Sequence, residues 1–224
     1  NMSQEILDFL RMIGVNNQFI SIYNEVIYIN NLKFSRFSRK KEELFIARYP
    51  EWKVVRSKLF QKMCVRASRV LSKSLHPKEH IFLEKSCNCE DIALYIILEP
   101  YTRKYGVQII FNDDLDNVLP GDLVKVASTL TLDGEVENII SQMLQGKKIE
   151  PTTSDSESWV KKIYPLINIP STWIETWMDE NDFPCEIPHN DMVSHDLIEF
   201  LAEYIPDVRE NILKSTQFVY DKKQ

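Results

Sequence analysis

The sequence predicts an α/β protein in which helices flank a parallel β-sheet, and the stretch from His80 to Asp114 carries most of that prediction. Here an apolar run, a small polar turn, a helix-length apolar segment and a second apolar run follow one another. That order is typical of strand, loop, helix and strand. The middle segment is apolar nearly all round, as expected of a helix buried against a parallel sheet. We therefore expect a βαβ unit.

The helix of this unit has recognisable ends. Glu90 and Asp91 place negative charge in its first turn, and Gly106 supplies a left-handed residue after its last. Pro100 should kink it. In an open parallel sheet the ligand crevice lies beyond the carboxyl ends of the strands, where a loop leads into a helix N-terminus. The candidate ligand loop is therefore Lys85 to Glu90.

Composition and charge narrow the class of protein. A chain of 224 residues with 44% hydrophobic residues and 5 glycines can build a compact, helix-rich body. Residues 1–75 hold 14 Lys and Arg against 6 Asp and Glu, whereas residues 76–224 hold 13 against 27. A basic segment on an acidic body indicates contact with a polyanion, between the two halves of the chain, or between subunits.

Apolar runs and cysteines indicate where in the cell the protein is found. The chain has no apolar run of roughly eighteen residues, and Glu5 and Asp8 stand near its start in place of a basic segment. Its 4 cysteines do not make a secreted disulfide framework. We expect a soluble protein of the reducing cytoplasm that contacts no membrane.

The first fifty residues predict a helix, a hairpin and a basic cluster. Met2 to Ile13 has apolar residues at helical spacing, and Phe19 to Ile29 is rich in β-branched and aromatic residues around a central Asn-Glu pair. Cations and hydroxyls then alternate around one aromatic residue, which suits phosphate contacts and base stacking. A solvated surface is the alternative interpretation. The candidate RNA-binding residues are Arg36, Arg39, Lys40 and Lys41.

Further elements follow from periodicity. We expect one long helix from Trp52 to Leu75 and a strand from Leu123 to Ala127. Thr172 and Glu175 have the spacing of a capping box at the start of another helix. The remaining predicted helices cover Gly134 to Leu144, Ser171 to Asn181, Ser194 to Tyr204 and Asp207 to Tyr220.

The candidate loop carries a family resemblance. Ser86-Cys87-Asn88-Cys89-Glu90-Asp91, followed by Ile92-Ala93-Leu94, resembles the PP-loop ATP pyrophosphatases of the tRNA-modifying branch, which makes 2-thiocytidine, 2-thiouridine or lysidine. In that family the strand ends in Ser-Gly-Gly-x-Asp-Ser and x-Ala-Leu follows. The stretch from Ser128 to Asn138 resembles the second family motif, in which Asp133 and Glu137 match.

The resemblance implies a Rossmann-like PP-loop domain over residues 51–224, closed by C-terminal helices, after a basic N-terminal extension over residues 1–50. For an active member it also implies ATP and Mg²⁺ as cofactors and adenylation of a tRNA base. Ser86, Asn88 and Asp91 would then hold the pyrophosphate.

The loop departs from the family chemistry. Two glycines let a backbone approach pyrophosphate closely, and Cys87 and Asn88 occupy those places. Glu90 and Asp91 would repel a polyphosphate. We therefore predict a pseudoenzyme with a degenerate nucleotide site and no cofactor, which binds tRNA or another RNA, a protein partner or a second copy. The alternative is the active ATP-dependent enzyme.

Cysteines and Asp133 leave alternatives open. Cys87 and Cys89 stand at a helix N-terminus, where a thiolate is favoured, but a structural loop explains them as well. A metal would need further ligands, for which Cys185, His76 and His80 are the available types, and we predict none. Asp133 either caps the helix that starts at Gly134 or binds magnesium with ATP.

Overall fold

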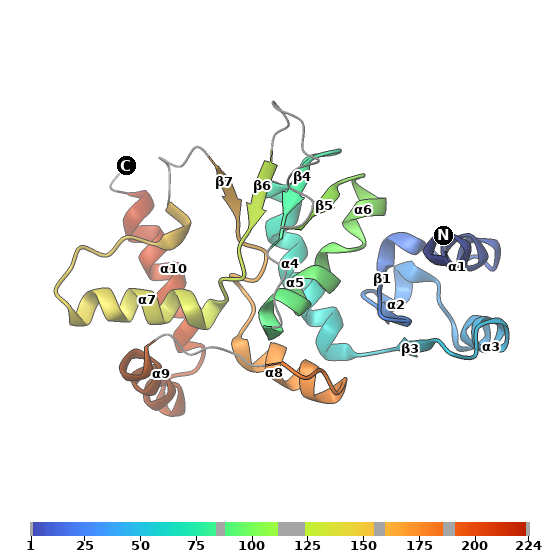
Figure 1. The fold of residues 1–224 in the computed structure, drawn as a ribbon. Helices are drawn as coiled ribbons and strands as arrows, with labels where there is room; N and C mark the ends of the chain where they lie inside the picture. The colour runs from blue at the N-terminus through green and yellow to red at the C-terminus, as the bar shows by residue number, and fades with distance from the viewer. Residues whose placement is uncertain (1, 84–87, 112–123, 155–159, 186–190, 223–224) are drawn as a thin grey trace.

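The computed structural model describes residues 2–83, 88–111, 124–154, 160–185 and 191–222 (Figure 1). Two sheets organise the chain, one with strand order β1-β2-β3 and one with order β5-β4-β6-β7. The strands of the second sheet pair in parallel and helices flank it. The predicted fold class, an α/β protein with a Rossmann-like parallel sheet, is confirmed.

The smaller sheet is built from the N-terminal residues. After α1 (Met2–Met12) and the short 3-10 helix η1 (Asn17–Phe19), β1 (Ile20–Tyr23) and β2 (Val26–Ile29) form the predicted hairpin. The two turn residues, Asn24 and Glu25, have φ angles of 46° and 59°. Positive φ at both positions gives a turn whose twist matches that of the strands. β3 (Lys53–Val55) pairs with β2 in parallel.

Two helices connect the hairpin to β3. α2 (Leu32–Ser35) is followed by α3 (Arg39–Arg48), and Ser38 caps α3 by accepting a hydrogen bond from the N–H of Lys41. α1 and α3 bury one face of the small sheet. The fully buried members of this apolar cluster include Ile6, Leu10, Ile20, Ile27, Ile29 and Phe45.

The expectation of one helix from Trp52 to Leu75 is wrong at its start. Residues 53–55 form β3, and α4 (Lys58–Ser74) begins after Ser57, whose side chain accepts a hydrogen bond from the N–H of Phe60. Val54 and Val55 are β-branched, and β2 offers them a strand edge to pair with. Helical spacing alone could not separate these residues from the stripe that follows.

The parallel sheet consists of β4 (His80–Phe82), β5 (Gln108–Ile110), β6 (Val124–Ala127) and β7 (Lys161–Ile163). From β4 the chain passes through α5 (Cys89–Leu98) to β5 on one side, and from β6 through α7 (Leu132–Leu144) and the 3-10 helix η3 (Thr152–Ser154) to β7 on the other. Because the neighbours β4 and β6 send their connections in opposite directions, their carboxyl ends form a topological switch point.

Pro100 divides the helix that precedes β5. α5 ends at Leu98 and the short α6 (Tyr101–Lys104) follows the proline, which lacks the N–H needed to continue the helix. Gly106 has a φ of 67°, the left-handed conformation predicted for it. The βαβ unit predicted between His80 and Asp114 is therefore present, with a break where Pro100 stands.

The C-terminal helices are α8 (Ser171–Glu180), α9 (Met192–Tyr204) and α10 (Val208–Asp221). α7, α9 and α10 gather beyond β7, while the N-terminal elements lie on the opposite side of the sheet (Figure 1). A second apolar cluster joins these three helices, with Val136, Ile198 and Leu213 buried in it. Among the described residues, no helix is long and apolar enough to cross a membrane.

A charged pair attaches the small sheet to the rest of the protein. Glu99, at the end of α5, accepts a hydrogen bond from the N–H of Ile22 at 2.9 Å. Arg103 of α6 donates to the carbonyls of Asn17 and Ile20 at 3.0 and 2.8 Å and to Glu99 at 2.9 Å. The division into residues 1–50 and 51–224 stays a prediction.

Candidate functional site

A crevice lies at the switch point between β4 and β6. It is a cavity of about 470 Å³, and its walls come from the first turn of α5, the loop after β6, the start of α7, the start of α8, and α9. Its lining includes Asn88, which immediately precedes α5, and Ser128 and Thr129, which immediately follow β6. This is the place where open α/β sheets bind their ligands.

Carboxylates dominate the walls of this crevice. Asp133 and Glu137, both on α7, are only 6% and 8% exposed. His195 is the one residue of a basic type among the side chains that line the cavity within the described part of the chain. The six acidic residues of the wall are Glu90, Asp91, Asp133, Glu137, Glu175 and Glu199.

Asp133 does not cap its own helix, so that prediction is wrong. α7 begins at Leu132, and Thr131 is its cap, with a side-chain oxygen 3.2 Å from the N–H of Gly134. Asp133 instead accepts a hydrogen bond at 2.6 Å from the N–H of Ser171, the first residue of α8. The capping box expected from Thr172 and Glu175 is absent, because α8 begins one residue earlier and Asp133 serves its free N–H group.

The same carboxylate reaches two further helices. Arg209 of α10 donates to Asp133 and also to Glu199 of α9. Glu137, one turn along α7, lies 3.0 Å from the Nδ1 atom of His195 on α9. The carboxylates of Asp133 and Glu137, the two residues that match the family motif, thus pair with side chains of neighbouring helices. Sequence analysis did not single out Arg209 or His195, because their partners lie 76 and 58 residues away.

A third acidic residue of α7 lies behind the crevice. Glu135 is fully buried, and one of its oxygens accepts a hydrogen bond at 2.7 Å from the N–H of Thr152. Burial raises the pKa of this carboxyl above its ordinary value, because the charged form loses its solvation. The helix that leads away from β6 therefore presents acidic side chains around much of its first two turns.

The loop after β4 is described only in part. Ser86 and Cys87, two of the predicted nucleotide-loop residues, lie outside the described residues. Asn88 stands at the N-terminus of α5 without a side-chain capping bond to that helix, and it lines the crevice. Glu90 and Asp91 follow in the first turn and also line the crevice, so the structure does bring them to Asp133.

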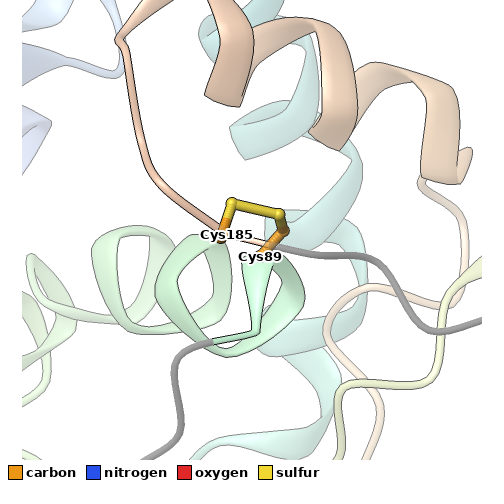
Figure 2. The surroundings of a disulfide bond; sticks show 2 residues. All are labelled: Cys89 and Cys185. Atoms are coloured by element: carbon orange, nitrogen blue, oxygen red, sulfur yellow. A yellow bond between two sulfur atoms is a disulfide. The ribbon is translucent and has the colours of Figure 1, made fainter.

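Cys89 is joined to Cys185 by a disulfide. Figure 2 shows the bond between the start of α5 and the segment that follows α8, across 96 residues of sequence. From the sequence, Cys185 is a candidate metal ligand and Cys89 a candidate thiolate, but their sulfur atoms are bonded to each other and neither is free for those roles. The bond holds in place the turn that carries Glu90 and Asp91. A cytoplasmic location stays a prediction.

The metal and histidine alternatives find no support in the described residues. Within those ranges, no group of three or more His, Cys, Asp and Glu side chains could hold a metal ion. His76 lies before β4, at the opposite end of the strand from the crevice, where its Nδ1 atom is 3.2 Å from both Glu79 and Lys125. It completes the surroundings of Lys125, a buried cation paired with Glu79 at 2.7 Å.

The four candidate RNA-binding residues have different roles. Arg36, Arg39 and Lys40 are exposed between α2 and the first turn of α3. Lys41 is half-buried, and its Nζ atom donates to the carbonyls of Gly14 and Arg36 at 2.7 and 2.8 Å. Lys41 therefore ties α3 to the end of α1, whereas the other three remain candidates for phosphate contacts.

Comparison with known proteins supports the fold. Neither a scan against protein-family models nor a search of curated proteins finds a match to this sequence. Among solved structures, the chain resembles the U34-tRNA thiolase NcsA from Methanococcus maripaludis, determined with its [4Fe-4S] cluster. The TM-score is 0.55 at 12% identity, over 73% of this chain and 79% of the thiolase. This chain therefore shares its fold with that thiolase.

Neither the cluster of that thiolase nor the ATP that the family resemblance implies fits the described residues. Two of the described cysteines are bonded to each other and the third, Cys64, packs on α4 against the core, which leaves no cysteine set for an iron–sulfur cluster in the described ranges. ATP would meet the carboxylates of the crevice. A phosphate site needs backbone N–H groups and cations, and the first turn of α5 supplies its own negative charge to those N–H groups.

The Asp133 network predicts a specific order of stability effects. Asp133→Asn should lower the free energy of unfolding by about 2 kcal/mol, because the guanidinium of Arg209 loses one of its two charged partners and keeps only Glu199. Thr131→Ala should cost about 1 kcal/mol as a lost helix cap, and Thr131→Ser should be nearly neutral. Urea unfolding of the three variants measures this order. If Asp133→Asn leaves the free energy of unfolding unchanged, the hydrogen bonds of Asp133 do not stabilise the fold.

The disulfide predicts a response to reductant. Reduction should lower the free energy of unfolding by about 2–5 kcal/mol, because an intact bond across a long loop restricts the unfolded chain. Urea titrations with and without dithiothreitol measure the difference. The double variant Cys89→Ser/Cys185→Ser is the control, and it should be as unstable as the reduced parent and insensitive to reductant. An equal response in both proteins would show that the bond has no such role.

Proposed function

We propose that this chain is a non-catalytic relative of the PP-loop tRNA-modifying enzymes, which binds RNA and uses no cofactor. One observation carries the proposal, namely the six carboxylates that line the crevice at the switch point. The likeness to a tRNA thiolase makes tRNA the first candidate among RNAs. The cytoplasm, where tRNA is found, is the proposed location.

Electrostatics argue against ATP in this crevice. Two like unit charges 4 Å apart repel by about 4 kcal/mol near a protein surface, and a triphosphate would face several such pairs. Magnesium could in principle bridge phosphates and carboxylates. Asp133 and Glu137 are, however, already paired with Arg209 and His195, so metal binding would first have to break bonds that hold α7 to α9 and α10.

The scaffold around the crevice has been kept although its chemistry differs. The helix α7 that follows β6, the entry of α8 and the C-terminal α10 all meet at Asp133. In this arrangement the residues that match the second family motif stabilise the fold. An active enzyme that adenylates a tRNA base is the alternative, and it would require these residues to exchange their present partners for a metal.

Pyrophosphate release tests the proposal. We expect no release from ATP and Mg²⁺ in the presence of bulk tRNA above the level without protein, while the same preparation retards tRNA in a gel-shift assay. Release that requires both the protein and tRNA would overturn the non-catalytic assignment. Failure to retard tRNA, together with no release, would overturn the RNA-binding assignment. Added pyrophosphate serves as the control for detection.

A further inference from the structure

An open groove runs along the outer face of α4, away from the crevice. It consists of two adjoining cavities of about 510 and 220 Å³. Asn30, Asn31 and Val65 line both cavities, which makes them one continuous surface. One end of the groove lies beside Trp173 of α8, and the other lies beside Phe34 of α2 and Lys104 of α6.

The charge of the groove is opposite to that of the crevice. Its lining includes four cations and no acidic residue among the described side chains. Cations without acidic neighbours favour an anionic ligand. They contrast with the chain as a whole, which carries a net charge of −6. Lys62 and Arg69 are exposed on α4 about two turns apart, and neither forms an ion pair with a described residue. The four cations are Lys62, Arg66, Arg69 and Lys104.

Aromatic rings stand beside these cations. Phe34 is 53% exposed, and its ring lies 5.4 Å from that of Phe19. At the other end the guanidinium of Arg66 lies 4.3 Å from the centre of the Trp173 ring. An exposed ring offers a face on which a planar base can stack.

Polar amides complete the groove. Asn31 accepts the N–H of Phe34 and so fixes the start of α2, while the side chain of Asn30 forms no hydrogen bond with the described residues. An amide of this kind can both donate to and accept from a base edge. Cations for phosphates, rings for stacking and an amide for base edges together match a single strand whose bases are splayed out.

We propose that this outer groove binds a single-stranded segment of RNA, with Lys62 and Arg69 on its phosphates and the ring of Phe34 stacked on a base. The inference rests on the proposed RNA-binding function and assigns it a surface. An acidic protein segment would use the cations and leave the rings uncovered. The groove is separate from the exposed cations Arg36, Arg39 and Lys40.

Fluorescence anisotropy with a labelled single-stranded RNA of about twelve nucleotides, a length within the range that single-strand-binding surfaces contact, tests this on the full chain. Lys62→Ala/Arg69→Ala should raise Kd at least tenfold and flatten the slope of log K against log salt by about 1.4. Phe34→Ala should raise Kd roughly five- to a hundredfold with no change in slope, and Phe34→Tyr should restore binding.

Matched controls separate the groove from general charge and apolar surface. Lys161→Ala/Lys162→Ala removes two exposed cations from β7, and Phe218→Ala removes a ring that is 59% exposed on α10. Both should bind as the parent does, and a duplex of the same sequence should bind at least tenfold more weakly. If the parent binds RNA and the groove variants bind equally well, the groove is the wrong surface and the proposed function stands. If the parent binds no RNA, both fail.

Discussion

The carboxylate of Asp133 is the interaction on which the arrangement around the crevice depends. It accepts the first N–H of α8 and the guanidinium of Arg209, and through Arg209 it is connected to Glu199 of α9. Three helices, α7, α8 and α10, therefore meet at Asp133, which is 6% exposed, and Arg209 adds α9. A buried carboxylate with such partners is costly to remove, because each partner would be left without its bond. The charge of Asp133 is used to hold the fold.

This use of charge separates two surfaces with opposite properties. The crevice at the switch point between β4 and β6 presents acidic side chains, whereas the groove along α4 presents cations and rings. The disulfide between Cys89 and Cys185 fixes the turn of α5 that contributes Glu90 and Asp91. We propose that a protein with carboxylates in its crevice and a cationic, aromatic groove elsewhere binds RNA in place of catalysis.

Local patterns predicted the elements well. Apolar runs and end signals predicted β4, α5 and β5, and the Asn24-Glu25 pair predicted the hairpin. The predicted start of α4 was wrong because Val54 and Val55 continue the helical stripe. They form a strand only because they pair with β2, which lies far from them in the sequence. β7 was missed because three residues, two of them lysines, carry no alternating pattern.

Features that join distant residues could not be predicted. Asp133 before a glycine looks like a cap, yet Thr131 two residues earlier takes that role and Asp133 serves α8. The pairing of Cys89 with Cys185 spans 96 residues, and sequence alone does not determine which cysteines pair. Asn88 and Glu90, from the described part of the predicted loop, line the crevice, but its far wall comes from α8 and α9, which no local pattern connects to it.

We propose that the crevice excludes ATP because its own carboxylates repel the phosphates. Isothermal titration of the disulfide-intact protein with Mg²⁺–ATP tests it most directly. We expect no saturable heat of binding up to about 1 mM nucleotide, the range in which even weak specific binding becomes visible. Saturable binding by the parent that disappears in Asp133→Asn, with the variant still folded, would contradict it.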